Sequence, residues 1–153
     1  MTVHVRSEHP RGRAAAARLR ARGRAFLCAL GRPEAELSVL LVGDRAIRAL
    51  NRRWRRVDRA TDVLSFPPAA GPGAGPVLGD VVISIDTAVR RARAEGRGAS
   101  AELERYLAHG LLHLLGYDHE APEDATRMAR REEEIIRSEG MVGSVLRRGA
   151  RTR

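Results

Sequence analysis

Three histidines lie within residues 109–119, at positions 109, 113 and 119. His109 and His113 are four residues apart, so on a helix their side chains would lie on one face, one turn from each other. Gly116 can adopt the left-handed conformation that ends a helix, which would turn the chain and bring His119 back toward the pair. Three imidazole nitrogens leave the fourth position of a tetrahedral zinc site open, as in catalytic zinc centres. The spacing therefore predicts a metal-dependent hydrolase with one Zn²⁺ ion.

The residue after the first histidine helps to choose between two reactions. The metzincin peptidases share the spacing His-x3-His-x2-Gly-x2-His, but they have a glutamate after the first histidine that acts as general base. Here that position is Gly110, which disfavours a metallopeptidase. A phosphodiester needs an ion that polarises a phosphoryl oxygen and a cation that stabilises charge on the equatorial oxygens. The sequence therefore favours phosphodiester hydrolysis.

Strand-like and helical patterns alternate around the histidines. A Pro/Gly/Ala stretch at 67–76 is expected to be a long connector. Two apparent βαβ crossovers, with the third and fourth strands antiparallel across that connector, predict an α+β fold: a small mixed four-stranded sheet packed with about five helices. The metal site would lie on a helix and its following loop. We expect strands at 2–6, 37–42, 62–66 and 80–85, and helices at 12–30, 44–56, 86–94, 100–116 and 122–140. Asp86 and Ser100 are expected to cap the third and fourth helices, and Pro122 to lie in the first turn of the last helix.

Length and composition indicate one domain with a polyanionic partner. The chain has 153 residues, the length of one domain, and a net charge of +9, which suits a partner rich in phosphates. All its basic residues are arginine, and GC-rich coding bias is part of the explanation for this composition. We expect a single domain over 1–140 and a basic, disordered tail over 141–153. The single cysteine excludes an internal disulfide and favours a reducing compartment, and no apolar run approaches the roughly 18 residues of a membrane span. A cytoplasmic protein is predicted.

Four motifs resemble those of one bacterial family. They are Asn51–Arg55, Thr61–Pro67, Leu78–Ser84 and His109–Glu120. In this order they resemble the YbeY family of ribosomal RNA maturation factors, which are single-strand-directed endoribonucleases; Ala60 stands where the family commonly has proline. The resemblance implies the same mixed sheet, zinc held by His109, His113 and His119, and Arg55 facing the metal across a cleft.

The resulting hypothesis is a zinc-dependent endoribonuclease that cleaves single-stranded RNA. It would act in maturation of the 16S rRNA 3′ end and in assembly and quality control of the small ribosomal subunit, with Arg55 binding the scissile phosphate. A non-catalytic ribosome assembly factor with a structural zinc remains the alternative, and a metallopeptidase is less favoured. The sequence does not indicate an oligomeric state.

Several neighbours of these residues have open roles. Arg52, Arg56 and Arg59 are further RNA-contact candidates. The spacing of Trp54 with other apolar residues of its helix predicts core packing rather than base stacking. Asp118, beside a proposed ligand, could orient an imidazole, cap the last helix or be exposed.

Overall fold

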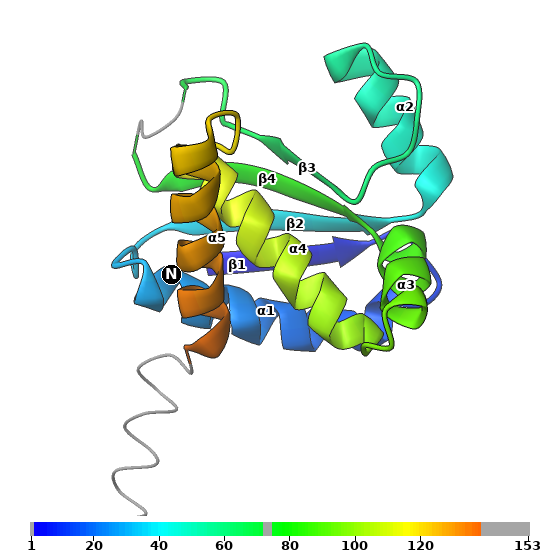
Figure 1. Ribbon diagram of the computed structural model, residues 1–153, viewed down its shortest axis with the longest axis horizontal. Helices are drawn as coiled ribbons and strands as arrows, with labels where there is room; N and C mark the ends of the chain where they lie inside the picture. The colour runs from blue at the N-terminus through cyan, green and yellow to red at the C-terminus, as the bar shows by residue number, and fades with distance from the viewer. Residues whose placement is uncertain (1, 72–74, 139–153) are drawn as a thin grey trace, which may run out of the picture.

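A single four-stranded sheet forms the centre of the fold (Figure 1). The computed structural model describes residues 2–71 and 75–138. The strands are β1 (Thr2–Ser7), β2 (Glu36–Val42), β3 (Val63–Phe66) and β4 (Val77–Ser84), in the order β1-β2-β4-β3. β1, β2 and β4 are parallel, whereas β3 is antiparallel to β4. The predicted mixed sheet and α+β class are therefore confirmed.

Helices pack on both faces of the sheet, but unequally. The described residues form α1 (Gly12–Ala29), α2 (Asp44–Arg55), α3 (Ile85–Ala94), α4 (Ala99–Leu114) and α5 (Pro122–Arg137). Alternate residues of β4 contribute to two different cores, because successive side chains of a strand point to opposite faces of the sheet. Val81 and Ile83 join the main core with α1, α4 and α5, while Val82 joins a smaller core with Ile47 of α2. In Figure 1, α2 stands apart from the other helices. No helix within the described ranges is long and apolar enough to cross a membrane.

α4 is the central helix of the main core and lies unusually close to the sheet. Its apolar residues Leu107 and Leu111 are fully buried. A Cβ atom built on Gly110 would lie 2.7 Å from Val81 Cγ1, so only glycine permits this approach. The Ser65 hydroxyl donates a hydrogen bond to the Gly110 carbonyl at 2.8 Å, which ties α4 to β3.

Two predicted helix caps are wrong. α3 begins at Ile85, and its cap is Ser84, whose hydroxyl accepts a hydrogen bond from the Thr87 amide at 3.2 Å. Asp86 instead accepts from the Asp44 amide at 2.8 Å, because the start of α2 packs beside it. α4 begins at Ala99 after Gly98, with no side-chain cap from Ser100.

Other boundaries differ from the sequence expectation in smaller ways. β4 starts at Val77, three residues before the predicted strand, because it pairs with β2 from Glu36 onward through a bulge. Pro122 does begin α5, as predicted. The helix is described to Arg137, and the predicted basic tail at 141–153 lies outside the described residues.

Trp54 is not part of the core. Its side chain is 61% exposed, although Ile47 on the same helix is fully buried. The predicted core role of Trp54 is therefore wrong. The apolar spacing identified the inward face of α2 correctly, but residues 52–55 at the C-terminal end of that helix are all exposed.

Candidate metal centre

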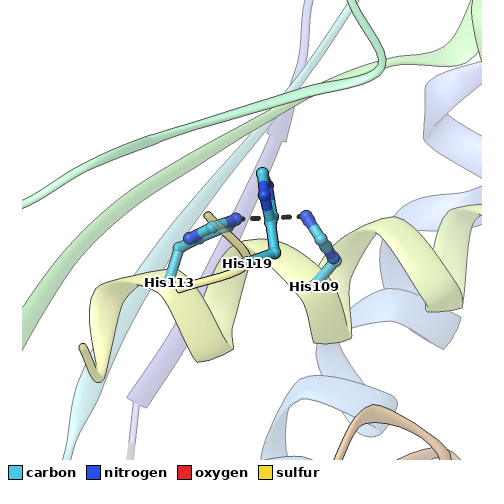
Figure 2. A group of neighbouring side chains, drawn as sticks. All are labelled: His109, His113 and His119. Atoms are coloured by element: carbon cyan, nitrogen blue, oxygen red, sulfur yellow. Dashed lines mark hydrogen bonds between the residues drawn. The ribbon is translucent and has the colours of Figure 1, made fainter. Parts of the chain in front are cut away.

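The end of α4 brings the three histidines together (Figure 2). His109 and His113 project from one face of the helix, which ends at Leu114. Gly116 has φ +96°, as predicted, and its amide donates to the His113 carbonyl at 3.0 Å. The Tyr117 amide donates to the Leu112 carbonyl at 3.0 Å, so the chain reverses tightly. The reversal places the ring of His119 beside the other two (Figure 2).

The three rings converge on one point. One nitrogen from each lies within 4.8 Å of the others, and the Nε2 atoms of His109 and His113 are 3.1 Å apart. Two Zn–N bonds of about 2.05 Å at a tetrahedral angle would place their nitrogens about 3.3 Å apart. The donor set and its spacing therefore fit a metal ion such as zinc.

The outer nitrogens of two rings have acceptor partners. His109 Nδ1 lies 3.1 Å from Glu132 Oε2, and His113 Nδ1 lies 3.1 Å from the Tyr117 carbonyl oxygen. A carboxylate and a carbonyl only accept hydrogen bonds, so the network assigns the ring protons to both Nδ1 atoms. Both Nε2 atoms then present lone pairs to each other, an arrangement that a shared cation stabilises.

His113 has a lowered pKa, which suits a metal ligand. Its burial lowers the pKa of the imidazole below the ordinary value, and the neighbouring His109 and His119, together with Arg55, lower it further; the hydrogen bond to Tyr117 acts in the opposite direction. A lowered pKa keeps the ring neutral at pH 7, and only a neutral imidazole can bind a metal.

Glu132 on α5 is a residue that the sequence analysis missed. Its Oε2 atom contacts His109, while Oε1 accepts from Arg105 at 3.2 Å, and its side chain is only 13% exposed. Asp118, considered for this role, instead accepts from the Glu120 amide at 2.7 Å. The acidic run at 132–134 was visible in the sequence, but only the packing of α5 against α4 shows which member reaches the histidines.

Arg55 lies in the same cleft as the three histidines. The cleft has a volume of about 690 Å³ and is lined by residues of α2, β3, α4 and the loop after α4, including Arg55, Arg59 and all three histidines. One guanidinium NH₂ of Arg55 donates to the Ser65 carbonyl at 2.9 Å. The structure thus brings Arg55 and the histidines together, whereas Arg52 and Arg56 do not line this cleft.

The family model described as Endoribonuclease YbeY matches residues 18–140. The chain belongs to the YbeY family. This confirms the resemblance seen in the motifs, and the matched range includes Arg55, Glu132 and the three histidines.

Relatives and a solved structure agree with membership of the YbeY family. A protein of Anaeromyxobacter sp. (strain Fw109-5) named Endoribonuclease YbeY is 69% identical over 153 residues, which is all of this chain and 80% of that protein. A protein of the same name from Aquifex aeolicus (strain VF5) is 46% identical over 112 residues, covering 73% of this chain and 75% of that protein. The solution structure of TM1509 from Thermotoga maritima matches with a TM-score of 0.59 and 26% identity, over 87% of this chain and 88% of that one.

Proposed function

We propose that this YbeY-family protein is a zinc-dependent endoribonuclease that cleaves single-stranded RNA. One observation carries the proposal: three convergent imidazoles and an arginine line a single cleft. The names of the relatives, Endoribonuclease YbeY, agree with this reaction.

His109, His113 and His119 would hold the ion in this centre. When bound, zinc would supply a Lewis acid that polarises a phosphoryl oxygen and lowers the pKa of water. The hydrogen bonds from Nδ1 of His109 and His113 fix the rotation of those two rings and keep their Nε2 atoms directed at a common point. The protein thus prepares the ligands before the ion binds.

Arg55 would bind the scissile phosphate. A guanidinium group has five N–H donors in a fixed plane, and the contact with Ser65 uses one amino group of Arg55 to hold the side chain over the cleft. The remaining donors suit phosphate oxygens, and the positive charge would stabilise the charge that builds on them during cleavage.

Gly110 supports RNA rather than peptide as the substrate. The corresponding position carries the general base in metzincin peptidases. In this fold a side chain at 110 would collide with Val81, and its Cβ would also lie 3.1 Å from Ser65 Oγ. The close packing of α4 on the sheet thus leaves no room for a glutamate there.

We further propose that the substrate is ribosomal RNA in the bacterial cytoplasm. The protein would act in maturation of the 16S 3′ end and in assembly and quality control of the small ribosomal subunit. The motifs shared with the YbeY family and the net charge of +9, which suits a polyanion, support this assignment.

His113→Ala and Arg55→Ala test the proposal together. We expect His113→Ala to lower the zinc content of the purified protein and to abolish cleavage of labelled single-stranded RNA. Arg55→Ala should retain zinc but lower kcat/KM by about 10²-fold, the range seen when one transition-state donor is removed. Arg48→Ala is the matched control, because Arg48 is also on α2 but pairs with Asp58 outside the cleft.

Two outcomes would contradict a catalytic zinc. Unchanged cleavage by metal-free His113→Ala protein would show that the ion is not needed for the reaction. Zinc-loaded wild-type protein that binds ribosomal subunits but cuts no RNA would instead identify a non-catalytic assembly factor with a structural zinc.

A further inference from the structure

A second groove lies on the α2 side of the sheet. It has a volume of about 810 Å³. Trp54 and Leu50 of α2 and Phe66 at the end of β3 form its apolar wall. Trp54 is 61% exposed, and its ring lies edge-on to Phe66 at 6.4 Å between centroids. No packing role within the described part of the chain accounts for this exposed tryptophan beside a groove.

A polar row crosses the floor of this groove. Strand pairing aligns His4 with Ser38, Ser38 with Asp80, and Asp80 with Phe66, so one residue from each strand stands on the same face. All four line the groove. Asp80 is exposed, and its carboxylate makes no hydrogen bond or ion pair with any described residue. The groove therefore combines a stacking wall with a free hydrogen-bond acceptor.

The groove adjoins the metal cleft at one shared residue. Pro67 lines both, and Arg55, which lines the cleft, follows Trp54 in the chain. The guanidinium of Arg53 lies 5.1 Å from the centre of the Trp54 ring. Arg6 also lines the groove, where its only described ion pair is a 3.8 Å contact with the exposed Glu8. A chain of phosphates that leaves the cleft past Pro67 would thus meet further cations.

We propose that this groove binds an unpaired base of the RNA that flanks the scissile phosphate. The base would stack on Trp54, and its edge would donate hydrogen bonds to Asp80, as in other single-strand readers. Guanine fits best, because its Watson–Crick edge offers two adjacent N–H donors to the two oxygens of a carboxylate. The inference rests on the proposed function, since it assumes that RNA occupies the cleft.

Trp54 reports its own occupancy, because it is the only tryptophan in the chain. We expect a 2′-O-methyl 12-mer of uridine with guanine at alternate positions to quench its fluorescence in the zinc-loaded protein. Trp54→Ala should raise KM for a cleavable 12-mer about tenfold, the size of one lost stacking contact. Trp54→Phe should restore most of this loss, and kcat for a trinucleotide that reaches only the cleft should not change.

Two further variants test the specificity and provide the control. Asp80→Asn should reduce the preference for the guanine-containing 12-mer over the all-uridine 12-mer by about tenfold, because an amide presents only one acceptor. Val77→Ala is the matched control: Val77 is an exposed apolar residue on the same strand, outside the groove. It should leave both KM and the preference unchanged.

The outcomes separate this inference from the proposed function. If RNA does not quench Trp54 and Trp54→Ala leaves KM unchanged while cleavage is intact, the groove does not bind a base. It would then serve another occupant, such as a protein segment. If Asp80→Asn lowers KM equally for both 12-mers, the proposal is also wrong, since the carboxylate would then only repel RNA. If the wild-type protein cuts neither substrate, the proposed function fails, while the fluorescence titration still decides whether RNA enters the groove.

Discussion

Glu132→Gln is the sharpest test of how the proposed metal centre is built. The carboxylate accepts from two donors at once, His109 Nδ1 through Oε2 at 3.1 Å and Arg105 through Oε1 at 3.2 Å. Glutamine has nearly the same shape, but its amide nitrogen cannot accept. One of the two donors would therefore face another donor, and the ring of His109 would lose its anchor or its fixed proton.

The size of the effect follows from the burial of this contact. Loss of a residue that orients a metal-binding histidine lowers metal affinity by about 10- to 100-fold. The Glu132 side chain is only 13% exposed, so water cannot readily replace the carboxylate. We expect zinc to bind about 30-fold more weakly, equivalent to about 2 kcal/mol. Competition with a chelating dye of known zinc affinity measures this directly.

Glu133→Gln is the control for this experiment. Glu133 is the next residue, pairs with the same Arg105 at 2.9 Å and forms no hydrogen bond or ion pair with His109. The zinc affinity of the Glu133→Gln protein should stay within about twofold of wild type, because loss of the Glu133 carboxylate leaves the orientation of His109 intact. Urea unfolding of both variants in excess chelator would show any general loss of stability. Equal zinc affinities of the two variants would refute the orienting role of Glu132.

Two further predictions concern stability. Gly110→Ala places a methyl group 2.7 Å from Val81 Cγ1 and should lower the free energy of unfolding by about 1–3 kcal/mol; an unchanged urea midpoint would contradict the close approach of α4 to the sheet. Burial by itself would raise the pKa of Asp44, but hydrogen bonds from Ser84, Thr87 and Arg90 outweigh it and hold the pKa below the ordinary value of 3.8. The stabilisation is therefore complete above that value and is lost as the pH falls through the lower folded-state pKa. Asp44→Asn should flatten the acid limb of a plot of unfolding free energy against pH, and an acid limb as steep as that of wild type would argue against this linkage.

The histidine cluster shows how much local sequence can predict. Two histidines one helical turn apart, followed by a glycine at the helix end, define a geometry within eleven residues. Backbone hydrogen bonds of the helix and its turn fix that geometry, whatever packs around it. The convergence of His109, His113 and His119 was therefore predictable without tertiary contacts.

Trp54 and Glu132 show where the same reasoning stops. Apolar periodicity predicts which face of α2 points inward, but it cannot tell how far the opposing layer extends, and Trp54 lies beyond it. Glu132 is one of three consecutive glutamates, and the packing of α5 against α4 selects it for contact with His109. Both depend on the relative placement of two elements.

The sequence alone thus determined the histidine trio and the turn that gathers it, because these depend on contacts between residues near each other in the chain. The order of strand and helix patterns also predicted the mixed sheet, although its strands pair over long distances in the sequence. Only the tertiary structure decided that Arg55 from α2 shares a cleft with histidines more than fifty residues away, since β3 joins the two through contacts with Ser65. It also opened a groove beside that cleft, because one helix covers too little of its face of the sheet.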